Sequence, residues 1–449
     1  MTLINDLDYR YAWRWLLPLR NRNWIALIGF SEPERAFWRL ALPGSVITED
    51  WAKATVWLIQ DQPLCDLAHY EAAPVHTVCI IGSRSMVATW RNGLAGRFAA
   101  VHDYALLPPH RPRVVIPLGV SDWTLHALAL HRPGRPLARL AVSLLSLLAR
   151  IGFDRTLRTR MLCIASRANA MPQGARQAGL DLNRSDAPQT FALYLGNPNG
   201  HRKTVILPLG GSAQILLKSG ESPKAKAALH NEAATLKMLS QTALAPQTPA
   251  LLNVVECDDA LTLYQEYRAR HVVSQARLEQ AAVAFLSELS RLERRQRPLA
   301  EVLAQEPFLT SAAARTAGQT AYAAIREYLD TLAAAGFTVW GHRSHGDFAP
   351  WNCAWTNQGF FVFDWEESRE WDVALGDAFY YVFASVLYIQ RGADMQKTLH
   401  AALHWAKQVA SMANMAYLDV RVYLALWLIS RVEQTEFYNL LVLLNQSWR

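Results

Sequence analysis

The chain has 449 residues, of which 51% are hydrophobic, so it is too long for one compact domain and has ample material for buried cores. Its net charge of +7 is uneven, because residues 1–185 contain 22 Lys and Arg against 13 Asp and Glu, whereas residues 186–449 contain 23 against 25. The five cysteines show no Cys-x-x-Cys spacing, which argues against a disulfide framework or a zinc site. The sequence contains no dense basic run interleaved with aromatic residues, so no nucleic-acid partner is expected.

The sequence shows neither a secretion signal nor a transmembrane helix. Its first residues carry acidic side chains where a signal peptide needs positive charge. The longest apolar stretch, near Leu140–Ala149, is about half as long as a membrane span. We therefore expect a cytoplasmic protein. The basic N-terminal part leaves two interpretations open: an ordinary surface with internal Arg–carboxylate pairs, or a peripheral contact with an anionic membrane or a polysaccharide assembly.

Residues 1–165 are predicted to form an α/β domain of uncertain role. Short runs rich in β-branched residues predict buried strands at Ala54–Ile59, His76–Ile81 and Arg113–Leu118. An apolar helix is predicted at Pro136–Ile151. Strands that alternate with helices favour an α/β layer. No G-x-G-x-x-G dinucleotide fingerprint follows any of these strands.

A second pattern of elements follows a linker predicted at residues 166–188. Three strands, the turns between them and a helix are predicted in the order Phe191–Leu195, Gly196–Gly200, Thr204–Leu209, Gly210–Gly211, Ala213–Lys218 and a helix from Ser222-Pro223. A lysine at the end of the third strand can reach the phosphates of a nucleotide that the first turn covers. Glu232 on the following helix can point at Lys218 and fix its position.

The remaining sequence is predicted to be mostly helical. Ala, Leu and Glu recur at helical spacing in five segments, Gln275–Arg295, Thr310–Ala335, Trp371–Gln390, Asp394–Asn414 and Ala416–Asn445. These segments predict a helical lobe that is interrupted by one short stretch of different character.

That stretch is His345-Gly-Asp-Phe-Ala-Pro-Trp-Asn352, followed by the apolar run Phe361-Val-Phe363 and then Asp364. Phosphoryl transfer needs one carboxylate that accepts the proton of an attacking hydroxyl, together with an amide and a second carboxylate that hold magnesium. Asp347 is the candidate base, and Asn352 and Asp364 are the candidate magnesium ligands. The residues from Asn352 to Asp364 allow a hairpin that brings the two ligands together.

These motifs resemble the aminoglycoside phosphotransferase and choline kinase group of the protein-kinase-like fold, over residues of about 188–449. His345–Asn352 is typical of that group, and Asp364-Trp365-Glu366 and Gly376-Asp377 resemble the motifs that follow in it. The resemblance implies ATP (or GTP) and Mg²⁺ as cofactors, with Asp347 as base and Asn352 and Asp364 as metal ligands.

The same resemblance implies roles for residues nearer the N-terminus. Lys218 contacts phosphate with Glu232 as its partner, and the backbone of Gln265-Glu266-Tyr267 lines the adenine site. The phosphate loop departs from the usual glycine-rich pattern, because it contains only Gly196 and Gly200.

We therefore predict an α+β chain in which a two-lobed kinase-like fold follows the N-terminal α/β domain. The predicted boundaries are 1–165 for the α/β domain, 166–188 for the linker, 189–271 for the small β-rich lobe and 272–449 for the helical lobe. The predicted function is phosphoryl transfer to a hydroxyl of a small molecule such as a sugar, an aminoglycoside or an amino alcohol.

Two alternatives stay open from the sequence. One is a pseudokinase or binding module in surface-polysaccharide biosynthesis, whose basic N-terminal domain is the interaction surface. The other is a methyltransferase fused to a kinase, since Leu106–Leu118 resembles late segments of methyltransferase-like proteins. That activity would need residues 1–185 to bind S-adenosylmethionine, although the cofactor-binding glycine cluster is missing.

Overall fold

The computed structural model describes residues 7–63, 74–118, 143–147, 160–167, 190–305 and 319–446, with shorter gaps inside these ranges. The chain forms two compact units. The first contains Met1–Leu229 and Leu251–Tyr267, and the second contains His230–Ala250 and Arg268–Arg449. Of the predicted helix at Pro136–Ile151, the structure describes Ser143, Leu144, Ser146 and Leu147, which are helical, and the rest of it and nearly all of the predicted linker lie outside the described residues.

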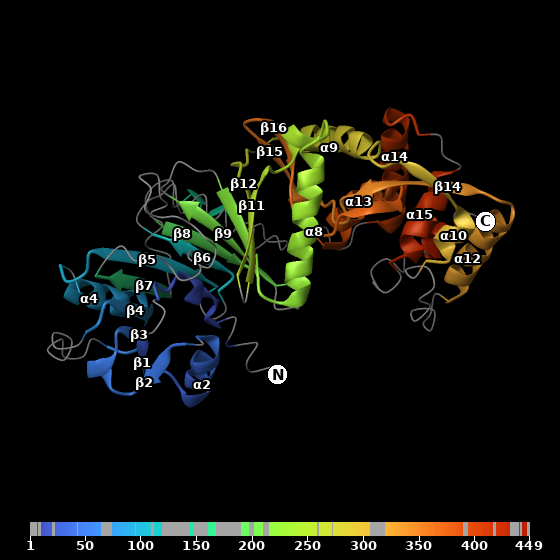
Figure 1. The fold of residues 1–449 in the computed structure, drawn as a ribbon. Coiled ribbons are helices and arrows are strands. Elements are labelled where there is room, and N and C mark those ends of the chain that lie inside the picture. Colours follow the sequence, from blue (N-terminus) through green and yellow to red (C-terminus); the bar gives the residue numbers. More distant parts are fainter. Residues whose placement is uncertain are drawn as a thin grey trace. The chain divides into compact units, whose positions relative to one another are not determined.

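One sheet runs through the described part of the first unit (Figure 1). It contains twelve strands in the order β11-β12-β10-β9-β8-β6-β5-β7-β4-β3-β1-β2. Their bounds are β1 Trp24–Ile28, β2 Val46–Thr48, β3 Val56–Gln60, β4 Thr77–Gly82, β5 Ala100–Leu107, β6 Val114–Pro117, β7 Met161–Ser166, β8 Thr190–Leu195, β9 Lys203–Leu209, β10 Ile215–Gly220, β11 Leu251–Cys257 and β12 Ala260–Glu266.

The N-terminal part of this sheet confirms the predicted α/β layer. Strands β2, β1, β3 and β4 pair in parallel. Two helices, α2 (Glu32–Ala41) and α4 (Arg84–Leu94), follow β1 and β4 in the chain. Parallel neighbours need such crossover connections, and strands buried on both faces read as the apolar runs seen in the sequence.

The sheet continues without a break into the strands that follow the predicted linker. Val114 and Val115 of β6 pair with Tyr194 and Leu193 of β8 in antiparallel register. Strands β8, β9, β10, β12 and β11 then pair antiparallel in turn. The predicted domain boundaries at residues 165 and 188 stay a prediction, because one sheet spans both sides of them.

One hydrophobic core joins the N-terminal segment to strands from both parts of the sheet. Trp13 and Leu16 of the short helix η1 (Ala12–Leu16) are buried in a cluster that also includes Leu217 of β10 and Tyr264 of β12. Because successive side chains of a strand point to opposite faces, Lys218 lies on the face away from this cluster. The N-terminal segment therefore supports the strand that carries Lys218.

The described part of the second unit is mostly helical, as predicted, and the α+β class is confirmed. Helix α8 (Pro223–Leu239) follows β10, as the Ser222-Pro223 signal indicates, and its residues from His230 onward belong to this unit. The other elements are η4 Ala245–Gln247, α9 Gln275–Leu289, β13 Arg295–Pro298, α10 Leu299–Leu303, α12 Gln319–Ala334, β14 Thr338–Ser344, η6 Pro350–Asn352, β15 Cys353–Thr356, β16 Gly359–Val362, β17 Arg369–Val373, α13 Gly376–Tyr388, α14 Met395–Met412 and α15 Val420–Ile429. No helix among the described residues is long and apolar enough to cross a membrane.

One helix prediction was wrong at its start. The sequence pattern predicts a helix over Trp371–Gln390, but Arg369–Val373 form strand β17 and helix α13 begins at Gly376. The strand forms because Val373 and Asp372 pair with Gly341 and His342 of β14, and this long-range pairing outweighs the local helical pattern.

Candidate active site

The loop that carries Asp347 follows strand β14 and lies against the loop after β16. Gly346 adopts a φ of +85°, and a Cβ atom at this position would lie 2.1 Å from the backbone oxygen of Glu367. Only glycine permits this conformation and this close approach together. The glycine between His345 and Asp347 therefore lets the base loop reach the metal-ligand loop.

Asp377, in the first turn of helix α13, binds the backbone of the same loop. Its carboxylate accepts the backbone N–H of His345 at 2.6 Å and that of Gly346 at 3.0 Å. Burial raises the pKa of Asp377 to about 6, although the two backbone N–H groups favour its ionised form. Gly376-Asp377 resembles a motif of the predicted family, and in the structure its carboxylate holds the backbone of the base loop.

His345 connects the base loop to the end of the hairpin. Its Nδ1 atom accepts the backbone N–H of Asp347 at 3.3 Å, so its Nε2–H donates to the backbone oxygen of Phe363 at 3.1 Å. This pattern assigns the neutral tautomer that carries the proton on Nε2. Phe363, which precedes Asp364, is thereby hydrogen-bonded to His345, which precedes Gly346.

Asn352 orients the candidate base directly. Its Nδ2 atom donates to the backbone oxygen and to the Oδ2 atom of Asp347, each at 2.9 Å. Because both partners are acceptors, the amide oxygen Oδ1 points elsewhere and is the atom that can bind a cation. Asn352 thus contacts the base while keeping a hard oxygen ligand.

The pKa of Asp347 is raised to about 6, mainly because the side chain is largely buried. The negative charges of Asp364 and Glu367 raise it further, whereas hydrogen bonds from Tyr380 and Asn352 lower it. A carboxylate with this pKa is mostly ionised at neutral pH and is a stronger base than an exposed aspartate.

The predicted hairpin is confirmed and places Asp364 at its end. Strands β15 and β16 pair antiparallel from Cys353↔Val362 to Thr356↔Gly359. Asp364 follows with a φ of +73°, a conformation that side-chain-bearing residues adopt rarely and that clusters at functional sites.

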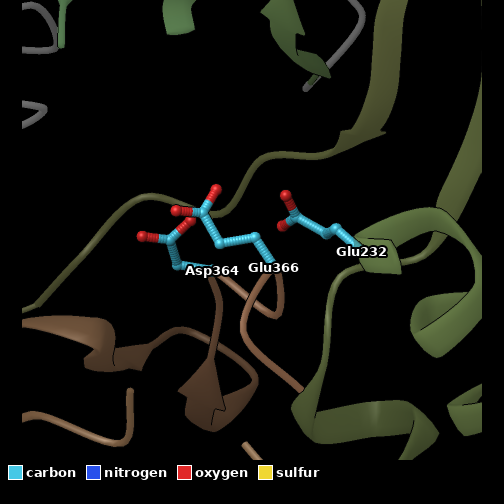
Figure 2. A group of neighbouring side chains, drawn as sticks. All are labelled: Glu232, Asp364 and Glu366. Carbon is cyan, nitrogen blue, oxygen red and sulfur yellow. The ribbon is translucent and has the colours of Figure 1, made fainter. Parts of the chain in front are cut away.

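Three carboxylates meet beyond the hairpin. Figure 2 shows the side chains of Glu232, Asp364 and Glu366 pointing toward one another, and one oxygen of each lies within 4.8 Å of the others. Glu232 is fully buried, and its Oε1 atom also accepts the backbone N–H of Trp365 at 3.4 Å. Carboxylate oxygens, with the amide oxygen of Asn352, are the ligands that Mg²⁺ prefers, so the residues present fit this metal.

Sequence reasoning named two of these three carboxylates and gave one of them another role. Glu232 was predicted as the partner of Lys218, and the structure shows it beside Asp364. Glu366 was not predicted as a ligand, although it lies in the motif Asp364-Trp365-Glu366. The assignment of Asn352 and Asp364 as the ligand pair stays a prediction.

The other predicted site residues belong to the first unit. Lys218 is 5% exposed on β10, where it pairs with Val205 and Leu263. Its pairing with Glu232 stays a prediction, because the two residues belong to different compact units. Gly196 directly follows β8, and its N–H donates to the oxygen of Lys203 at 3.0 Å, whereas Gly200 lies outside the described residues.

The predicted hinge residues lie at the end of β12 and just beyond it. Gln265 and Glu266 are the last residues of the strand, and Tyr267 is the last residue of the first unit. The side chain of Gln265 is buried, and its Oε1 atom finds no hydrogen-bond partner among the described residues. The adenine-binding role of this backbone stays a prediction.

Comparison with known proteins agrees with the resemblance seen in the motifs. Residues 198–407 match the model of the phosphotransferase enzyme family (APH), so the predicted family is confirmed for this part of the chain. This region contains Asp347, Asn352 and Asp364, as well as Lys218. No curated protein matches the chain in sequence.

Among solved structures, the chain is similar to several antibiotic kinases. A thermostable mutant of aminoglycoside phosphotransferase APH(4)-Ia is 12% identical, with a TM-score of 0.40 over 57% of this chain and 94% of that one. APH(3'')-Id from Streptomyces rimosus, in complex with ADP and streptomycin, is 17% identical, with a TM-score of 0.32 over 50% and 88%. The amicoumacin kinase hAmiN is 13% identical, with a TM-score of 0.36 over 55% and 84%.

Proposed function

We propose that this protein is a small-molecule kinase that transfers the γ-phosphoryl group of ATP or GTP to a hydroxyl group. The observation that carries the proposal is the anchoring of Asp347, whose carboxylate is oriented by Asn352 and whose loop is held by Asp377. The match of residues 198–407 to a phosphotransferase family supports it.

In the proposed reaction, Asp347 accepts the proton of the acceptor hydroxyl as that hydroxyl attacks the γ-phosphorus. The hydrogen bond from Asn352 holds one carboxylate oxygen, so the other can face the acceptor. Asp364 and Asn352 hold the metal, with Glu366 beside Asp364. Magnesium, when bound, supplies positive charge that offsets the charge of the phosphates.

Residues of the first unit have supporting roles in the proposal. Lys218 contacts phosphate, and the backbone of residues 265–267 binds the adenine. Most of the rate acceleration in such sites comes from positioning and charge neutralisation, so the chain needs no covalent intermediate.

Thermal unfolding with and without Mg-ATP tests the proposal. A ligand present at about a hundred times its dissociation constant adds about 2.7 kcal/mol to the free energy of unfolding. We expect a magnesium-dependent stabilisation in the wild type that Asp364→Ala removes. The matched control is Asp330→Ala, because Asp330 is a half-exposed carboxylate on α12 that pairs with Arg326.

A stabilisation that both variants retain would contradict the role of Asp364. Its absence in the wild type with both ATP and GTP would contradict the proposed function itself. A positive result leads to a screen of small-molecule hydroxyl acceptors, with release of ADP or GDP as the measurement.

A further inference from the structure

Helix α8 makes a second contact with the metal-ligand loop, one residue before Glu232. The Nδ2 atom of Asn231 donates to the backbone oxygen of Glu366 at 2.8 Å and to that of Ser368 at 2.9 Å. Both hydrogens of one amide group are therefore used on two carbonyl oxygens of the same turn. No other standard side chain of this size offers two donors on one atom and no charge.

Other elements of the second unit also hold this loop. Residues 363–368 connect β16 to β17, and within this turn the N–H of Ser368 donates to the backbone oxygen of Trp365 at 3.1 Å. The side chain of Ser368 also donates to the backbone oxygen of Ser344 at 2.7 Å. The loop is therefore held by contacts with β14 as well as with α8.

The conformation of Asp364 depends on such contacts. A residue with a side chain in the left-handed region costs on the order of 1 kcal/mol or more and persists only where the surroundings hold it. Asp364 has this conformation immediately before the segment that Asn231 and Glu232 bind. Asn231 and Glu232, which are adjacent on helix α8, therefore bind the loop by hydrogen bonds. These bonds reach Trp365, Glu366 and Ser368.

We propose that Asn231 is a positioning residue for the metal site, which holds the 364–368 loop in the conformation that presents Asp364 and Glu366 to magnesium. This inference rests on the proposed function for the identity of the metal. The hydrogen bonds of Asn231 to the loop do not depend on that function. In this proposal Asn231 acts through the two backbone oxygens that it binds.

Amide hydrogen exchange on the full chain without ligands tests the contact first. We expect Asn231→Ala and Asn231→Leu to increase the exchange rate of the amides of residues 364–368 at least tenfold. The Leu variant keeps a side chain of similar size, so it separates lost hydrogen bonds from lost volume. Lys237→Ala is the control, because Lys237 is an exposed residue of the same helix. Unchanged exchange in both Asn231 variants would overturn the inference.

Magnesium titration in the presence of ADP then tests the consequence, with the shift in melting temperature as the measurement. We expect the Mg²⁺ concentration for half of the full shift to rise about tenfold in both Asn231 variants, while stabilisation by ADP in EDTA stays unchanged. If the Asn231 variants lose stabilisation by ADP equally with magnesium and in EDTA, the role of Asn231 is a general structural one, and the inference is overturned. If the wild type does not respond to nucleotide, the proposed function fails, whereas the exchange measurement still decides the contact.

Discussion

The carboxylate of Asp377 accepts the backbone N–H groups of both His345 and Gly346, and so a helix start holds the loop of the candidate base. Hydrogen bonds to an ionised group are stronger than neutral ones, and a backbone N–H buried without a partner is costly. Asp377 is therefore a structural support that acts on the chemistry through the two residues before Asp347.

The raised pKa of Asp377 predicts a pH dependence of stability. Its pKa of about 6 lies above the ordinary value of 3.8, because burial and the charge of Asp372 outweigh the two backbone bonds and the charge of Arg431. The folded state therefore binds the proton more tightly than the unfolded state. The stabilisation is fully present below pH 3.8 and is lost as pH rises through about 6.

Urea unfolding of the wild type and Asp377→Asn at pH 5 and pH 7.5 measures this effect. We expect the stability of the wild type relative to the variant to fall by about 1 kcal/mol between the two values. Other titrating groups are shared by the two proteins, so they cancel in the difference. A difference that is constant or rises with pH would show that the carboxylate is not protonated preferentially in the folded state.

Asp347→Asn is expected to abolish phosphoryl transfer while leaving nucleotide binding nearly intact. General-base catalysis typically increases the rate by a factor of about 10²–10⁴. The amide of the asparagine variant cannot accept the proton of the acceptor hydroxyl. The measurements are ADP release with Mg-ATP and an acceptor, or with water as acceptor, and the stabilisation by Mg-ADP. Asp330→Asn is the control for the change from carboxylate to amide. Full activity in Asp347→Asn would refute the assignment of the base.

Gly346→Ala is expected to destabilise the protein more than Gly336→Ala. Both glycines have positive φ angles, of +85° and +78°, so each substitution carries the same backbone cost of about 1 kcal/mol. A Cβ at Gly346 would also meet the oxygen of Glu367 at 2.1 Å, whereas nothing lies within 4 Å of one at Gly336.

Thermal or urea unfolding of the two glycine variants gives the comparison. The additional clash is expected to cost Gly346→Ala a further 1–3 kcal/mol, about the range seen for overpacked sites. Equal destabilisation would mean that the base loop and the Glu367 backbone do not pack as closely as the structure shows.

Tyr380→Phe is expected to reduce the turnover number about tenfold with little change in KM for Mg-ATP. The hydroxyl of Tyr380 donates a hydrogen bond to Asp347, and its loss removes one of the contacts that orient the base. Tyr381→Phe is the matched control, because Tyr381 is the next residue of α13 and packs against Phe348 and Trp405. If both variants lose turnover equally, the loss does not come from the bond to Asp347.

The parts of the site whose residues lie near one another in the chain were predictable from the sequence. His345, Asp347 and Asn352 share one loop, and the hairpin to Asp364 is short, so local geometry alone brings them together. The strands β8, β9 and β10 and the start of α8 were likewise predictable, because turn residues and alternating apolar residues act over a few positions.

The contacts that support this site join residues far apart in the chain and could not be predicted. Asn231 reaches Glu366 across 135 residues, and Asp377 reaches His345 across 32. The pairing of β6 with β8 also joins the N-terminal layer to the later strands in one sheet. A single sequence contains no local signal for such pairs, because a hydrogen bond between distant residues depends on the packing of whole elements and not on spacing. The same reason turned Arg369–Val373 into a strand against its helical pattern.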